Sequence, residues 1–211
     1  MSRTNVHFIV CLTLSCLTAA AVPASAQHFQ QITGTPLSQI AAGRKEVWGL
    51  YNSRIYRFNP GSGGFDQIQG SLSQIAVGGG TLLQSDEVWG LDSGGSAYRF
   101  NFSTKTFTLQ SGPGVLQLSQ IAVGAGYEDN CHPYEIWGIN STYIYRYNYC
   151  ISQFENIEIS FIDTYIPEGG MFTQIAVSGA GDVWGLYPGS SAPAVLEFTG
   201  GPWGDRATPT G

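Results

Sequence analysis

The chain has 211 residues, of which 43% are hydrophobic and only 11% are charged, and its formal net charge is −6 at pH 7. Its nine lysines and arginines form no cluster, whereas phosphate backbones and anionic lipid surfaces are bound through such clusters. The composition therefore argues against nucleic acid as a partner and against membrane binding through positive charge.

The first 26 residues are typical of a secretory signal peptide. Arg3 supplies a short positive start, residues 8–22 are apolar, and residues 24–26 form a small-residue cleavage site. The apolar run is short for a membrane span, and no second candidate follows it. We therefore expect a protein that is secreted to the extracellular space or the periplasm. Lipid attachment at Cys16 is the alternative, which the neighbouring residues fit poorly.

The rest of the chain contains four copies of one pattern. Each copy begins with Ser/Thr-Gln-Ile-Ala and continues with an acidic residue, an aliphatic residue and Trp-Gly. The spacings between successive tryptophans are 41, 48 and 47 residues, a period typical of arrays that reuse one supersecondary unit. The repeated tryptophans are Trp48, Trp89, Trp137 and Trp184.

Each repeat divides into short runs rich in Val, Ile, Tyr, Phe and Trp, and these runs are separated by Gly, Asn, Ser and Pro. This alternation predicts strands and turns, and no sustained helical period is found. Three repeats have four runs and the last has three. The predicted strands are 37–42, 46–50, 54–58, 65–69, 72–77, 87–91, 96–100, 106–110, 118–123, 135–139, 143–147, 154–159, 172–177, 182–186 and 194–198.

The predicted fold is all-β, a propeller of four-stranded antiparallel blades with one blade per repeat. Residues 29–34 resemble residues 65–70, the last predicted strand of the first repeat. An N-terminal strand could therefore complete the fourth blade and close the ring, although an open arc that closes by self-association predicts the same pattern. We assign residues 27–199 to the propeller and residues 200–211 to a flexible tail.

Two cysteines, Cys131 and Cys150, follow the predicted signal peptide. They flank a predicted hairpin almost symmetrically, and residues equidistant from a hairpin turn face each other. In an exported protein this arrangement predicts a disulfide, with free thiols as the alternative.

Asn101 and Asn140 begin N-glycosylation sequons, which matter only if the source organism glycosylates its exported proteins.

The four tryptophans allow two interpretations. They could be platforms for the apolar face of a sugar ring, or they could fill the space between neighbouring blades. Because both faces of a blade are covered in a propeller, burial of each indole would contribute about 5 kcal/mol before entropy. We favour the core for the indoles, and we keep all four tryptophans as candidate ligand-binding residues.

Three repeats also carry a glutamate two residues before the tryptophan and an arginine nine or ten residues after the tryptophan. Across a hairpin this spacing brings the arginine opposite the tryptophan, or nearly so, where a guanidinium can stack on an indole. The group is either a brace within each blade or a polar pocket for sugar hydroxyls. The candidate residues are Arg57, Arg99, Arg146, Glu46, Glu87 and Glu135. The fourth repeat differs, with Asp182 as its acid and Glu197 in place of the arginine.

Signals for catalysis are weak. The only histidines after residue 26 are His28 and His132, and no zinc-site spacing, catalytic triad or phosphate loop is found. We predict no metal, no cofactor and no enzymatic activity.

The repeated glutamines are expected to bond to backbone near a central channel, with ligand binding as the alternative. They are Gln39, Gln74, Gln120 and Gln174.

The motifs Leu-x-Gln-Ile-Ala-Val-Gly, Val-Trp-Gly-Leu, Ile-Tyr-Arg-Phe-Asn and Phe-x-x-Ile-x-Gly together resemble tectonin-type β-propeller repeats, from Phe29 to Phe198. This resemblance to tectonin and tachylectin-like lectins implies binding of bacterial lipopolysaccharide or of modified sugars, including O-methylated ones. Such lectins resemble six-bladed rings, whereas four repeats are visible here. We therefore expect a secreted lectin that binds glycan or lipopolysaccharide multivalently without catalysis. A protein-interaction module at the cell surface or in the envelope is the alternative.

Overall fold

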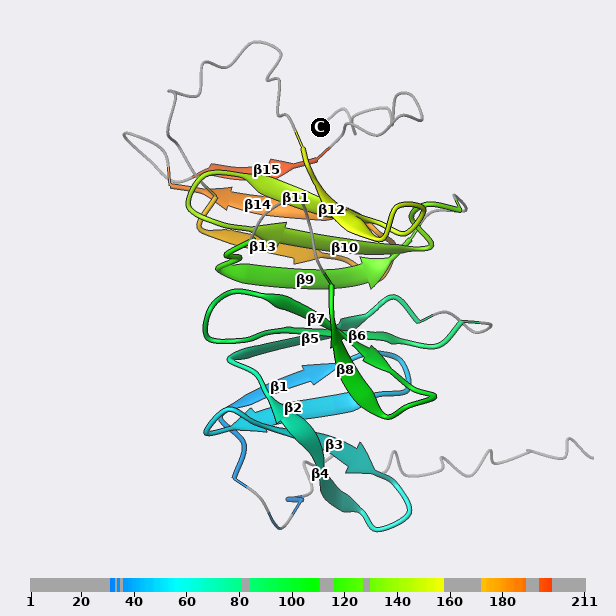
Figure 1. Ribbon diagram of the computed structural model, residues 1–211. Helices are drawn as coiled ribbons and strands as arrows, with labels where there is room; N and C mark the ends of the chain where they lie inside the picture. Colours follow the sequence, from blue (N-terminus) through cyan, green and yellow to red (C-terminus); the bar gives the residue numbers. More distant parts are fainter. Residues whose placement is uncertain are drawn as a thin grey trace, which may run out of the picture. The chain divides into compact units, whose positions relative to one another are not determined.

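We describe residues 31–32, 34, 36–80, 84–110, 116–126, 130–157, 172–188 and 194–198 of a computed structural model. These residues are all-β and form four antiparallel sheets (Figure 1). The chain divides into two compact units, residues 1–31 and 32–211, and the second unit contains all four sheets. The predicted signal peptide, most of the predicted strand at 29–34 and the predicted tail lie outside the described residues.

Each sheet corresponds to one sequence repeat, and its strands follow one another in chain order. The first three sheets have four strands, and the fourth has three in the described part of the chain. The strands are β1 Gln39–Ala42, β2 Val47–Tyr51, β3 Arg54–Asn59 and β4 Gly64–Ser71; β5 Gln74–Gly78, β6 Glu87–Leu91, β7 Ala97–Asn101 and β8 Thr106–Leu109; β9 Gln120–Ala125, β10 Tyr134–Ile139, β11 Ile144–Asn148 and β12 Gln153–Asn156; and β13 Gln174–Val177, β14 Val183–Tyr187 and β15 Ala194–Glu197.

Each predicted run overlaps a strand, because β-branched and aromatic residues suit a pleated, half-buried surface. The turns between strands use residues that accept a left-handed backbone. In the two-residue turn between β2 and β3, Asn52 and Ser53 have φ values of 48° and 62°. Two such residues match the twist of the flanking strands, so the hairpin register is well defined. In that register Trp48 lies opposite Arg57, as predicted.

Consecutive sheets pack against each other through their first strands: β1 on β5, β5 on β9, and β9 on β13. Glycines permit this close approach. A Cβ atom at Gly78 would overlap the carbonyl oxygen of Val123, and one at Gly124 would overlap the side chain of Val177. Among the described residues, the fourth sheet makes no comparable packing with the first. The all-β architecture is thus as predicted, whereas closure into a propeller stays a prediction.

The core lies between successive sheets rather than within one sheet. One cluster of buried side chains joins the first and second sheets around Trp48, and another joins the second and third around Trp89. A third joins the third and fourth sheets around Trp137. Each repeat therefore buries its apolar surface by packing on its neighbour, as repeat proteins do. In the described part of the chain, no helix is long and apolar enough to cross a membrane.

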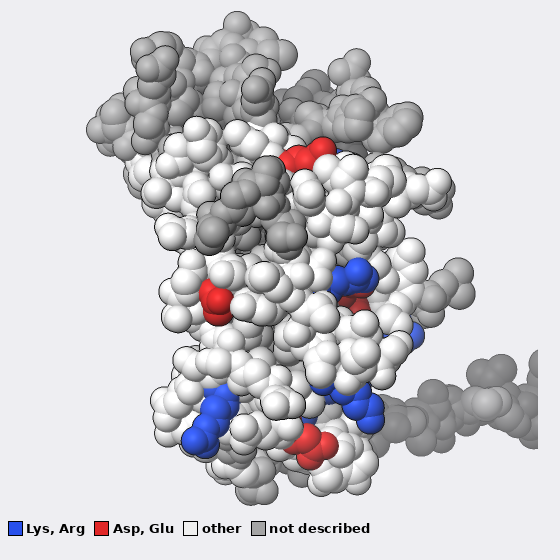
Figure 2. All heavy atoms as spheres, viewed as in Figure 1, with Lys and Arg blue, Asp and Glu red and all other residues white. Residues whose placement is uncertain are grey.

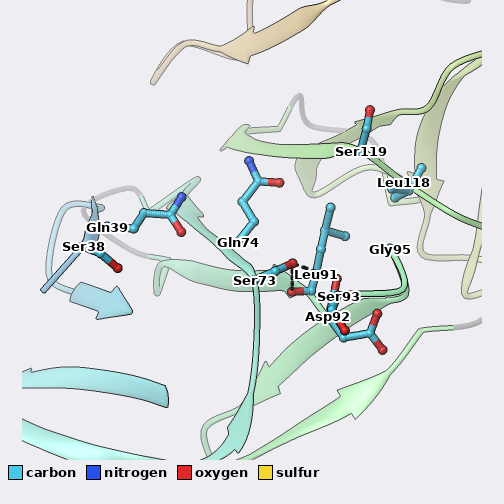
Figure 3. Close-up of a pocket in the computed structure, with 10 residues that line it drawn as sticks. All are labelled: Ser38, Gln39, Ser73, Gln74, Leu91, Asp92, Ser93, Gly95, Leu118 and Ser119. Atoms are coloured by element: carbon cyan, nitrogen blue, oxygen red, sulfur yellow. Dashed lines mark hydrogen bonds between the residues drawn. The ribbon is translucent and has the colours of Figure 1, made fainter. Parts of the chain in front are cut away.

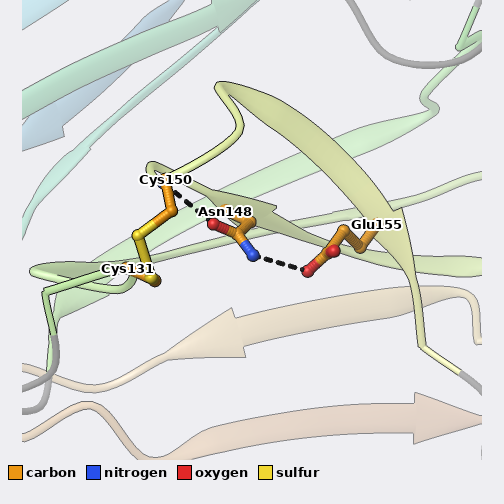
Figure 4. The surroundings of a disulfide bond; sticks show 4 residues. All are labelled: Cys131, Asn148, Cys150 and Glu155. Atoms are coloured by element: carbon orange, nitrogen blue, oxygen red, sulfur yellow. Dashed lines mark hydrogen bonds between the residues drawn. A yellow bond between two sulfur atoms is a disulfide. The ribbon is translucent and has the colours of Figure 1, made fainter.

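The predicted disulfide between Cys131 and Cys150 is confirmed (Figure 4). The two cysteines are 19 residues apart and join the segment before β10 to the turn between β11 and β12. Asn148 organises this turn, because its side-chain oxygen accepts a bond from the Cys150 amide at 2.9 Å and its nitrogen donates to Glu155 at 3.0 Å. The crosslink therefore ties the hairpin of the third sheet at the end remote from its turn.

Replacing both cysteines by alanine should lower the free energy of unfolding by about 3 kcal/mol. The crosslink closes a loop in the unfolded chain and so lowers its conformational entropy, and this effect is lost in the variant. Urea denaturation of the double variant and of the oxidised wild type measures this difference. Adding a reductant should destabilise the wild type by a similar amount and leave the variant unchanged. Equal denaturation midpoints for the variant and the wild type would show that the crosslink is not stabilising.

Candidate functional site

The predicted Glu–Arg–Trp groups form in the first three sheets. In the first sheet, Nε and Nη2 of Arg57 donate to the two carboxylate oxygens of Glu46 at 2.7 and 2.6 Å. The indole Nε1 of Trp48 donates to the same carboxylate at 3.0 Å. The second and third sheets repeat this arrangement with Glu87–Arg99–Trp89 and Glu135–Arg146–Trp137. A bidentate pair that also accepts an indole N–H fixes all three side chains.

The three pairs differ in burial. The side chain of Arg146 is 11% exposed and that of Glu135 only 1%, whereas the side chains of Arg57 and Arg99 are 34% and 36% exposed. Burial by itself lowers the pKa of Arg99, but the hydrogen bonds and charge of Glu87 outweigh burial and raise it. The guanidinium therefore stays charged. The third pair is a buried brace, and the first two also present part of a guanidinium to solvent.

The indoles of the first three repeats lie in the core, as the sequence favours. Trp48, Trp89 and Trp137 are at most 1% exposed, and each meets an aromatic ring of the next sheet edge-on. The centroid distances are 4.6 Å to Phe100, 4.7 Å to Tyr147 and 4.8 Å to Phe198. These contacts account for the repeated tryptophans as packing residues. The role of the Trp, Arg and Glu set in ligand binding stays a prediction.

The fourth repeat is different in the structure as well as in the sequence. Trp184 lies opposite Glu197, as predicted, and its side chain is 41% exposed. No sheet follows the fourth one to cover this indole in the described chain.

The glutamines of the first strands connect neighbouring sheets. The side-chain oxygen of Gln39 accepts the backbone N–H of Ile75 at 3.1 Å, and Gln74 and Gln120 accept those of Ile121 and Ile175 at 3.0 and 2.7 Å. The expected bond to backbone is therefore present in three repeats. Each bond uses only the oxygen of the amide. In the described residues, the NH₂ groups of Gln39 and Gln74 have no hydrogen-bond partner.

These two NH₂ groups belong to residues that line a polar hollow of about 690 Å³ where the first strands of three sheets begin (Figure 3). Figure 3 shows Gln39 and Gln74 extending over the hollow from neighbouring strands. The serines beside them donate to strand carbonyls, as Ser73 does to Leu91 and Asp92, and keep their lone pairs free to accept. The lining consists of Ser38, Gln39, Ser73, Gln74, Leu91, Asp92, Ser93, Gly95, Leu118 and Ser119.

Asp92 is the single carboxylate among the residues that line the hollow. It accepts the backbone N–H groups of Gly94 and Ser96 at 2.8 and 2.9 Å and the hydroxyl of Tyr98 at 3.3 Å. Burial would raise the pKa of Asp92, but the bonds from Ser96, Gly94 and Tyr98 outweigh burial and lower it. The carboxylate therefore stays ionised at neutral pH and holds the turn between β6 and β7, so it is unsuited to act as a general acid.

The repeated Ser/Thr-Gln pairs are visible in the sequence, but their position around one hollow is not, and no motif singles out Asp92, Ser93 and Gly95. Repetition of the pair was the available signal, because equivalent positions of neighbouring repeats lie side by side in a stacked array.

On the face of the molecule in Figure 2, charged atoms form small separate spots of both signs. No group of side chains suited to a metal ion occurs among the residues that the structure describes.

Comparison with known proteins places this architecture in a family. The family model described as the tectonin domain matches residues 17–192, which is most of the chain. The chain belongs to the tectonin domain family. The resemblance inferred from the repeated motifs is thereby confirmed. The match begins within the predicted signal peptide and ends before β15.

No curated protein shows a significant match to this tectonin-domain chain. Among solved structures, it is similar to the extracellular domain of a protein from B. thetaiotaomicron assigned as a one component system, with 14% identity and a TM-score of 0.48. The similarity covers 82% of this chain and 24% of the other, so this chain spans about a quarter of its length. Similarity at this level carries no argument about function.

Proposed function

We propose that this tectonin-domain protein is an exported, lectin-like protein that binds glycan or lipopolysaccharide without catalysing a reaction. The observation that carries the proposal is the hollow at the start of the first strands, with unpaired amide donors beside serine acceptors. Sugar hydroxyls both donate and accept hydrogen bonds, so a mixed lining of this kind suits them. The volume of about 690 Å³ also lies within the range of roughly 300–1,000 Å³ that small-molecule sites occupy.

Repetition supports multivalent rather than single-site recognition. The hollow is lined by a serine of the first, second and third repeats in succession, at Ser38, Ser73 and Ser119, and Gln39 and Gln74 lie beside the first two. Several weak contacts to one extended glycan, or to several copies of a sugar on a surface, add to a much tighter overall binding. Arg57 and Arg99 keep about a third of their side chains exposed, so we retain them as proposed additional contacts on the sheet surfaces.

Two features support export and the absence of catalysis. A disulfide between Cys131 and Cys150 persists in oxidising compartments, which agrees with the signal-peptide pattern of residues 1–26. The lowered pKa of Asp92 and its three hydrogen bonds favour a structural carboxylate in the hollow rather than a proton donor.

A glycan array that includes methylated sugars and bacterial lipopolysaccharides tests the proposal. The expected result is a coherent set of bound glycans from which the oxidised protein is displaced by free sugar. An array without bound glycans, obtained with a folded protein, would instead favour a protein partner.

Replacing Gln74 by glutamate should weaken glycan binding about tenfold or more, because it removes the free NH₂ donor and leaves an acceptor in its place. The substitution keeps a side-chain oxygen for the Ile121 amide. Gln120→Glu is the matched control, since Gln120 makes the same bond to Ile175 but does not line the hollow. Titration calorimetry with the tightest array ligand measures both affinities. Equal losses in the two variants would remove the hollow from the proposed site.

A further inference from the structure

In the described part of the chain, the series of sheets leaves an apolar face partly exposed at each end. Within the series, the isoleucine of each first strand packs against the preceding sheet, and Ile75, Ile121 and Ile175 are 2–4% exposed. The equivalent Ile40 of the first sheet is 65% exposed. At the other end, Trp184 is 41% exposed, whereas the other three repeated tryptophans are at most 1% exposed.

The two end faces are defined by the residues that are equivalent to those of the internal interfaces. The receiving face is Ile40, Val47, Phe58 and Phe65 of the first sheet, which correspond to the residues that surround Trp48 in the second sheet. The presenting face is Gln174, Ala176 and Trp184 of the fourth sheet. In each of the three internal interfaces a presenting face lies against a receiving face, so the two end faces are complementary halves of an interface that already occurs three times.

The hydrogen bond of the internal interfaces is also left unmade at the ends. Each internal interface contains a bond from an isoleucine N–H to a glutamine side-chain oxygen of the preceding sheet. In the described part of the chain, the oxygen of Gln174 has no such donor and the N–H of Ile40 has no such acceptor. Docking the presenting face on the receiving face in the same register would pair these two groups.

One contact of the internal interfaces would not recur at the ends. Between the first two sheets, the buried carboxylate of Asp86 accepts the backbone N–H groups of Arg44, Lys45 and Glu46 at 2.6–3.0 Å. Lys45 occupies the position of Asp86 in the first repeat. Docking of the two end faces therefore relies on their apolar contacts and on the bond between Ile40 and Gln174.

We propose that the receiving face of one copy of this chain binds the presenting face of a second copy. Such an interface joins different surfaces of the two chains, and two copies joined at both ends form a closed ring. That ring would contain eight sheets, within the range of about four to eight that propellers adopt. The assembly goes beyond the proposed glycan binding and does not depend on it.

Mass measurement by light scattering during gel filtration tests the assembly. For the wild type we expect twice the mass of the single chain, falling to one chain only on strong dilution. Ile40→Lys and Trp184→Lys should each abolish the closed dimer, because a charge at either face must be buried against apolar groups. Leu109→Lys is the matched control, since Leu109 is 57% exposed on β8 and belongs to neither face. This variant should keep the wild-type mass.

Mixing the two disrupted variants separates this interface from other modes of association. The Ile40→Lys chain keeps its presenting face and the Trp184→Lys chain keeps its receiving face, so an equimolar mixture should form an open dimer. A face that binds its own copy would not be restored in this way. A wild type that has the mass of one chain at every concentration would overturn the proposal, whatever the variants do. So would a mixture without association, if both variants retain the wild-type circular dichroism.

Discussion

Replacing Arg146 with methionine should lower the free energy of unfolding by about 3–5 kcal/mol, because the change leaves a buried carboxylate without its partner. The side chain of Glu135 is 1% exposed, and Arg146 meets both of its oxygens. Methionine fills much of the same space, so the loss of charge pairing dominates the effect. Denaturation in urea at pH 7, at one protein concentration for all variants, gives the difference.

Two further variants make this prediction specific. The double change Glu135→Gln with Arg146→Met should recover part of the loss, since it removes the unpaired charge together with its partner. Arg57→Met should be milder, because the side chain of Arg57 is 34% exposed and water can solvate the remaining glutamate. Losses of equal size at the two arginines would contradict the assignment of the third pair as the buried brace.

Trp89→Ala should destabilise the protein by about 3–5 kcal/mol through the cavity that it leaves between the second and third sheets. The indole is fully buried, with ring centroids of Tyr147 at 4.7 Å and Phe154 at 5.8 Å. Its N–H also bonds to Glu87 at 3.1 Å, so the change removes packing and a hydrogen bond together. Thermal and urea denaturation of the variant measure the loss.

Tyr143→Ala provides the comparison for this substitution, because Tyr143 is 49% exposed. Its effect should stay within about 0.5–1 kcal/mol. If Trp89→Ala were as mild, the indole would not be part of the core between sheets, and a ligand platform would become the better account of the repeated tryptophans.

The strands and their register were predictable because the repeat supplies the same signal four times. The offset from Trp48 to Arg57 fixed which residues face each other across the hairpin, and the structure pairs these two residues. The disulfide was predictable from the same hairpin symmetry. These features depend on local alternation and turn chemistry, which a sequence displays directly.

The hollow and the end faces were not predictable in the same way. Gln39 and Gln74 were expected to bond to backbone, and they do, but the free end of each amide becomes apparent only when neighbouring sheets are placed side by side. Asp86 gave no repeated signal, because the other repeats carry Lys45, Tyr134 and Gly181 at its position. Similarly, the Trp-Gly motif presents Trp184 as equal to the other tryptophans, whereas its side chain is 41% exposed because no further sheet packs on it in the described part of the chain.

Recognition of glycan in the hollow is the central claim, and one array with three proteins tests it most directly. Wild type, Gln74→Glu and Gln120→Glu are applied in oxidised form to the same set of methylated sugars and lipopolysaccharides. We expect the wild type and Gln120→Glu to share a sugar-competable set of bound glycans and Gln74→Glu to lose it. Equal binding of the same glycans by all three proteins would contradict the claim. So would an array on which the folded wild type binds no glycan.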